Sequence, residues 1–205
     1  MHHNDNGFQE GLMSSSFAER VVKLCTNRFA TKEKGDVFNL HSKSPANLEG
    51  WITAETAVLI SQIHRGKIFV EMPYPNNDSR WADILAENSD KRTVIEIKDI
   101  CLFDPQNDEE GYARESKSTI RGLSYYRPSL NSCFAKMDSL RSNECEMLML
   151  IFVHPLNIRI RGEMIGVKQI DEYIKDIART RNGWSNIPTS PMDSFALLSA
   201  WVRNN

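Results

Sequence analysis

The sequence has no long apolar run, no excess of either charge and few cysteines, and each feature argues against a class of protein. No stretch approaches the roughly 18 apolar residues of a membrane-spanning helix, so we expect no membrane association. Lysine and arginine total 25 against 27 aspartates and glutamates, and the net charge of −2 provides no overall attraction to a polyanion. Binding to nucleic acid would therefore depend on local clusters of basic residues.

The chain also lacks the motifs of several common sites. Its four cysteines, Cys25, Cys101, Cys133 and Cys145, form no CxxC pair, which predicts neither a zinc site nor a disulfide framework. No P-loop, glycine-rich dinucleotide motif or GxSxG motif is present. The first eight residues are polar and do not resemble a secretory signal, so we expect reduced thiols and a cytoplasmic protein.

What is present is typical of a globular chain. Hydrophobic residues make up 40% and charged residues 25% of the 205 residues, which favours a single domain with one sizeable core. We expect residues 1–13 to be disordered and residues 14–205 to form that domain.

Hydrophobic periodicity predicts the order of elements. The predicted elements are a helix from Phe17 capped by Ser14–Ser16, a polar connector at 33–48, a helix at 51–64, strands at 67–72, 80–87 and 92–100, an acidic loop at 104–110, helices at 112–126 and 128–141 divided by Pro128, a strand at 146–154, a helix at 168–180 and a short helix at 195–202. Residues 146–154 are nearly all apolar, which indicates a central strand covered on both faces. The fold class is therefore α/β (mixed α+β), with a mixed sheet of about four strands flanked by helices.

Charged side chains gather on one face of the predicted hairpin. Because side chains alternate along a strand, Glu96 and Lys98 share a face, opposite to Ile95 and Ile97. An even turn at 88–91 pairs Glu87 with Arg92, Leu85 with Val94, Asp83 with Glu96 and Trp81 with Lys98. The same register places Ile84 opposite Ile95 and Ala82 opposite Ile97 on the apolar face.

Two adjacent carboxylates repel one another, and a hard cation between them relieves that repulsion. In this register Asp83 and Glu96 lie about 5 Å apart at Cβ, with Lys98 beside them. The set predicts Mg²⁺ or Mn²⁺ and metal-assisted hydrolysis. The alternative is that all three are solvent-facing charges on the polar side of a hairpin.

The arrangement of Asp83, twelve intervening residues and then Glu96-Ile97-Lys98 resembles the PD-(D/E)xK nuclease superfamily. The resemblance covers residues 51–155, so that 14–48 and 156–205 would be helical additions to a restriction-endonuclease-like core of order α-β-β-β-α-β. Ala82 departs from the family pattern, which has proline before the aspartate.

The resemblance implies further roles. The Ile97 carbonyl would join Asp83 and Glu96 as a metal ligand, Glu55 on the preceding helix would assist, and Lys98 would position the attacking water. Arg114, Lys117 and Arg121 form a basic stripe that would contact phosphates, with Tyr125 nearby. The glutamine that related exonucleases carry at this helix is absent, and a solvated helix face is the alternative reading of the stripe.

The expected function is thus a metal-dependent nuclease of the restriction, defence or repair type, acting on DNA in preference to RNA. A homodimer is an arrangement that the resemblance allows. The alternative is an inactive nuclease-fold protein that binds nucleic acid or a protein partner as a regulator or inhibitor.

Overall fold

The structure is a computed structural model that describes residues 15–42, 48–74, 77–102, 123–140, 145–156, 158–160, 163–189, 192 and 196–203. Its helices are α2 (Phe17–Phe29), α3 (Lys32–Ser42), α4 (Glu49–Ile63), α5 (Leu123–Asp138) and α6 (Val167–Arg179). Its strands are β1 (Lys67–Tyr74), β2 (Asn77–Glu87), β3 (Arg92–Cys101), β4 (Cys145–His154), β5 (Ile158–Ile160), β6 (Glu163–Ile165), β7 (Trp184–Ile187) and β8 (Leu197–Arg203). No described helix is long and apolar enough to cross a membrane.

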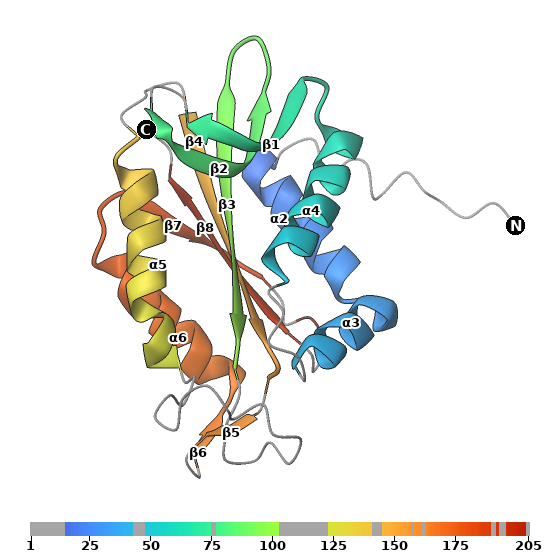
Figure 1. Ribbon diagram of the computed structural model, residues 1–205, viewed down its shortest axis with the longest axis vertical. Coiled ribbons are helices and arrows are strands. Elements are labelled where there is room, and N and C mark those ends of the chain that lie inside the picture. Colours follow the sequence, from blue (N-terminus) through green and yellow to red (C-terminus); the bar gives the residue numbers. More distant parts are fainter. Residues whose placement is uncertain are drawn as a thin grey trace, which may run out of the picture.

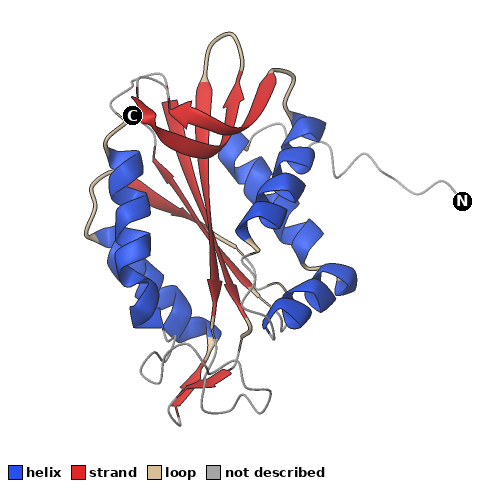
Figure 2. Cartoon of the chain, in the orientation of Figure 1, coloured by secondary structure: helices blue, strands red, loops and turns tan. Residues whose placement is uncertain are grey.

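A six-stranded sheet of order β1-β2-β3-β4-β8-β7 divides the molecule into three layers. Only β3 and β4 are parallel, and the other neighbours in this sheet are antiparallel. Helices α2, α3 and α4 cover one face and α5 and α6 cover the other, while β5 and β6 form a separate hairpin at one end (Figures 1 and 2).

Each face of the sheet carries its own hydrophobic core. Ile95 and Ile97 point into the core beneath α2, α3 and α4. Val94 and Ile100 point into the core beneath α5 and α6. Because side chains alternate along β3, Glu96 and Lys98 belong to the α5 face, and this decides which helix can reach them.

Several sequence predictions are confirmed. Ser16 caps α2 through a reciprocal pair of hydrogen bonds with Glu19, of 3.2 and 2.7 Å. Helices α4 and α6 and strands β1 to β3 occur where periodicity placed them, with no end shifted by more than three residues. Strand β4 lies between β3 and β8, and all its residues are buried, as its continuous apolar sequence indicated.

Other predictions are wrong. Residues 197–203 form strand β8, not part of a helix, because they pair antiparallel with β4 and complete its second edge. The expected connector contains helix α3, whose Phe38 is buried against Phe29 and Phe152. The sheet has six strands instead of about four, and the expected helical segment 156–205 contains strands β5 to β8 as well as helix α6.

Helix α5 also differs from its prediction. It continues through Pro128, where we expected the chain to end one helix and start another. Proline removes one hydrogen bond of the helix, but Leu130, Phe134 and Met137 are buried against the sheet and hold the helix together. The predicted disordered segment 1–13, the acidic loop and most of the helix at 112–126 lie outside the described residues.

Candidate active site

The candidate site lies where two paired strands separate. Strands β2 and β3 pair at Glu87–Arg92, Ala86–Thr93, Leu85–Val94 and Ile84–Ile95, which confirms the predicted register over these positions. The further predicted pairs do not form, because the β2–β3 pairing ends at Ile84 while β2 continues alongside β1. The gap between the strands therefore opens at Asp83.

A distortion in β1 accompanies this separation. Glu71 has a φ of +52° and lies between the paired positions Val70–Ile84 and Met72–Ala82, opposite Asp83. Residues other than glycine rarely adopt a positive φ. This unusual backbone conformation thus lies at the same level as the opening beside Asp83.

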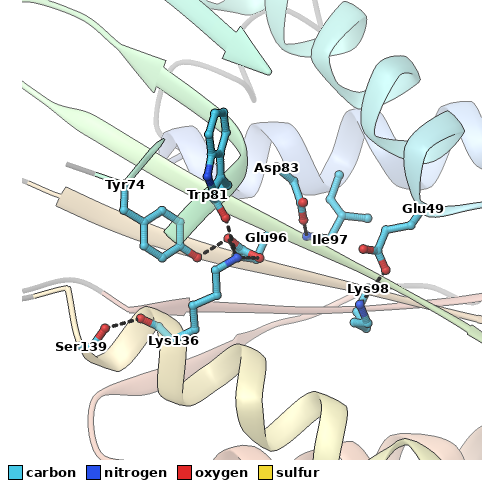
Figure 3. A network of polar contacts seen from close by, with 9 residues as sticks. All are labelled: Glu49, Tyr74, Trp81, Asp83, Glu96, Ile97, Lys98, Lys136 and Ser139. Carbon is cyan, nitrogen blue, oxygen red and sulfur yellow. Dashed lines mark hydrogen bonds and ion pairs between the residues drawn. The ribbon is translucent and has the colours of Figure 1, made fainter. Parts of the chain in front are cut away.

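Asp83 crosses the gap with its side chain. Its Oδ2 accepts a hydrogen bond of 2.6 Å from the backbone N–H of Ile97 (Figure 3). Since the N–H and C=O of one strand residue face the same neighbour, the Ile97 carbonyl also faces the gap. Burial, together with the charge of Glu49, raises the pKa of Asp83 in spite of the hydrogen bond from Ile97.

Glu96 is the most enclosed acid of the site, with 4% of its side chain exposed. The Tyr74 hydroxyl donates a hydrogen bond to its Oε1, and Lys136 Nζ lies 3.0 and 3.1 Å from its two carboxylate oxygens. Burial and the nearby charge of Asp83 raise the pKa of Glu96 to about 7. The two carboxylates therefore interact directly, from adjacent strands.

Lys98 faces the same site from the next position on that face of β3. Its Nζ donates a hydrogen bond of 2.7 Å to Glu49 Oε2 on α4. Burial lowers the pKa of Lys98, but the bond to Glu49 and the neighbouring acids outweigh it, and the net shift is upward. Lys98 is therefore an ammonium ion at neutral pH, suited to stabilising negative charge and unsuited to accepting a proton.

Cys133 on α5 borders this cluster. Burial raises the pKa of its thiol to about 11, and Lys98, Glu96 and Glu49 all influence it electrostatically. The thiol is therefore protonated at neutral pH and has little nucleophilic character.

The structure does not bring Glu55 to this cluster. Its carboxylate bonds to Lys34 at 2.9 Å and to Arg28 at 3.2 Å, on α3 and α2. The hydrogen bond from Lys34 is the main reason that the pKa of Glu55 is lowered. Glu49 is the acid of α4 that reaches the site. The predicted helix started at Trp51, which left Glu49 outside it.

The predicted phosphate contacts cannot be placed. Arg114, Lys117 and Arg121 lie outside the described residues, and so does the side chain of Tyr125. The cation that α5 does bring to the site is Lys136, which the sequence showed only as one of six basic residues between 114 and 141. Its role depends on how α5 packs on the sheet, and no spacing in the sequence reveals that.

The donor chemistry fits a hard divalent cation. Among the described residues, no group of three or more His, Cys, Asp or Glu side chains is arranged to hold a metal ion. Mg²⁺, however, is commonly held by one or two carboxylates together with water and substrate phosphates. Asp83, Glu96 and the Ile97 carbonyl provide such a partial set of oxygen ligands.

Comparison with known proteins gives no relative: the chain matches no protein-family model, no curated protein and no solved structure. The interpretation of the site therefore depends on its own chemistry.

Proposed function

We propose that the chain is a magnesium-dependent nuclease of the PD-(D/E)xK type that hydrolyses phosphodiester bonds, with DNA as the preferred substrate. One observation carries the proposal. Asp83 and Glu96 lie together at the β2–β3 gap, and the pKa of each is raised by burial and by neighbouring acids, while the Lys98 ammonium shares their face. A bound divalent cation would stabilise such a cluster. The order α4-β1-β2-β3-α5-β4 also agrees with the core that the resemblance implies.

Each residue has a role in this proposal. Asp83, Glu96 and the Ile97 carbonyl would hold the metal ion, and the Tyr74 hydroxyl would orient the Glu96 carboxylate. When bound, the ion supplies a more acidic water and neutralises charge on the phosphoryl group. Lys98 stabilises the negative charge that develops during attack, and Glu49 keeps its ammonium in position. Hydrolysis forms a bond from water oxygen to phosphorus and breaks a P–O bond, leaving a 5′-phosphate and a 3′-hydroxyl.

Cleavage assays test the proposal. Purified protein is incubated with plasmid, single-stranded DNA and RNA in Mg²⁺, Mn²⁺ or EDTA. We expect cleavage that EDTA abolishes and that Asp83→Asn or Lys98→Met lowers on the order of 100-fold or more. Glu87→Gln is the matched control, because Glu87 is a carboxylate on the same strand and face but bonds to Arg92 at 2.6 Å. Equal activity in all four proteins would contradict the assignment.

The two glutamates of α4 provide a second comparison within the same assay. Glu49→Gln removes the charged partner of Lys98, and we expect a loss of roughly tenfold or more, since hydrogen bonds to charged groups contribute about 1.5–3 kcal/mol. Glu55→Gln disturbs only the pairs with Arg28 and Lys34, so its cleavage rate should match that of the wild type. The opposite ranking would favour the role that the resemblance implied for Glu55.

A second function is favoured by the contacts of Glu96. Tyr74 and Lys136 already satisfy this carboxylate, as would suit a nuclease-fold protein that binds nucleic acid or a protein partner without cleaving. The two functions differ in metal binding. An inactive protein would show no Mn²⁺-dependent rise in melting temperature that Asp83→Asn removes.

A further inference from the structure

The packing of α5 places Lys136 beside the candidate site. On its helix, Phe134 and Met137 are fully buried against the sheet. Two residues further on, Asp138 bonds to Arg181 at 2.7 Å and to Arg203 at 2.6 Å. These contacts fix the C-terminal part of α5, so the fold keeps the backbone of Lys136 within reach of the site.

The surroundings of that ammonium have the character of a cation site. Three oxygen atoms accept its hydrogen bonds: both carboxylate oxygens of Glu96, at 3.0 and 3.1 Å, and the backbone carbonyl of Trp81 (Figure 3). The ring of Tyr74 lies 4.8 Å from the nitrogen, at a distance typical of a cation–π contact. Carboxylate and carbonyl oxygens are the donors that hard cations prefer.

A divalent ion and this ammonium compete for the negative charge of the Glu96 carboxylate. The Glu96 side chain is almost fully enclosed, with 4% exposed, so a metal ion reaches the carboxylate only if the groups around it move. Two cations at a few ångströms from one another in a half-buried site also repel strongly. The Lys136 ammonium therefore opposes binding of a metal ion at Glu96, and movement of Lys136 away from the carboxylate would favour it.

We propose that Lys136 competes with the metal ion: in the metal-free protein it pairs with the Glu96 carboxylate, and this lowers the affinity of the site for divalent cations. This inference rests on the proposed function, because it assumes that Glu96 is a metal ligand. It also explains how one site can have both the acids of a nuclease and the saturated contacts of an inactive protein. The metal affinity is then set by α5, and a partner that draws Lys136 away would activate the site.

Titration with Mn²⁺ alone, followed by calorimetry, tests the inference without measuring cleavage. Lys136→Met keeps most of the apolar stem and removes the charge, so we expect it to bind Mn²⁺ about tenfold more tightly than the wild type, which corresponds to about 1.4 kcal/mol. Lys136→Arg keeps the charge and should stay close to the wild type. Adding Asp83→Asn to Lys136→Met should abolish the tight binding and so place it at this site.

The outcomes separate the inference from the proposed function. Tighter binding in Lys136→Met that depends on Asp83 supports both, whether or not the wild type binds measurably. Wild-type binding that Asp83→Asn removes, without a gain in Lys136→Met, overturns the competition and leaves the nuclease proposal standing. Absence of binding in every protein overturns both. Lys136→Met removes a hydrogen-bond partner of the buried Glu96 carboxylate, so Lys136→Gln, which keeps a polar side chain at this position, is measured in parallel. A thermal melt in EDTA shows that each variant is folded.

Discussion

The Glu96 carboxyl group connects the chemistry of the site to the stability of the protein. Burial and the charge of Asp83 raise its pKa to about 7 from an ordinary value of 4.5. The folded protein therefore binds this proton more tightly than the unfolded chain does. The contribution to the free energy of unfolding is complete below pH 4.5 and is lost as the pH rises to about 7, by about 3 kcal/mol in total.

Substitution of Glu96 by glutamine measures this contribution. Glu96→Gln cannot ionise, so we expect its free energy of unfolding, relative to the wild type, to be higher at pH 8 than at pH 5 by about 3 kcal/mol. Urea denaturation of both proteins in EDTA provides the values, and Asp83 is present in each. A difference between the two proteins that is the same at both pH values would mean that Glu96 is already ionised at pH 5.

At the scale of single residues, the sequence predicts the part of the site that is local. Asp83, Glu96 and Lys98 share one face because strand alternation and one short turn determine their positions. Glu49 and Lys136 could not be predicted, because they reach the site from helices whose packing on the sheet depends on the whole fold. For the same reason, the sequence does not show that Glu55 bonds to Arg28 and Lys34, away from Asp83 and Glu96.

At the scale of elements, Gly66 controls how β1 joins the sheet. A Cβ at this position would lie 2.0 Å from the Glu87 carbonyl oxygen and 2.6 Å from His64 Nε2. We expect Gly66→Ala to push β1 away from β2 and to lower the free energy of unfolding by about 1–3 kcal/mol, as measured by urea denaturation.

Gly50→Ala is the control for Gly66→Ala, because no loss in the free energy of unfolding is expected for it. Gly50 lies in α4 with nothing within 4 Å of an added Cβ, so Gly50→Ala should leave stability unchanged or raise it by up to about 1 kcal/mol. Equal losses in the two variants would show that close contact with Glu87 is not the cause.

The secondary-structure prediction was wrong where pairing with a distant strand decides the conformation. Residues 195–202 contain Ala196, Leu197, Leu198 and Ala200, which favour a helix in isolation. Strand β8 forms nevertheless, because it pairs with the otherwise unpaired edge of β4. Its side chains pack on both faces of the sheet, with Leu198 in the core beneath α2, α3 and α4 and Leu197 in the core beneath α5 and α6. Strand propensity depends on such neighbours, and the neighbour of β8 lies about fifty residues earlier in the chain.

At the scale of the whole molecule, the order of the first strands was predictable and the completion of the sheet was not. Strands β2 and β3 are neighbours in the sequence and form a hairpin. The continuous apolar sequence of β4 indicates that this strand is central. Strands β7 and β8 are added to the far edge and are joined to α5 by polar contacts between residues distant in sequence. No periodic pattern in the sequence predicts these contacts.

Asp138 is the centre of this connection between α5 and the C-terminal strands. Its carboxylate bonds to Arg181 at 2.7 Å, to Arg203 at 2.6 Å and to Trp184 Nε1 at 2.8 Å. Asp138→Ala leaves two partly buried guanidinium groups without their common carboxylate, and we expect a loss of about 3 kcal/mol in the free energy of unfolding.

Asp176→Ala is the matched control for Asp138, because its carboxylate also pairs with an arginine, Arg127, but is 65% exposed. Such exposed pairs contribute little, so its effect should stay within about 1 kcal/mol. Urea denaturation compares the two variants. If both lose equally little, the cluster around Asp138 is dispensable and hydrophobic contacts alone hold α5, with Lys136 at its end, against the sheet. If only Asp138→Ala is strongly destabilised, the ion pairs of Asp138 with Arg181 and Arg203 also hold in place the helix that brings Lys136 to Glu96.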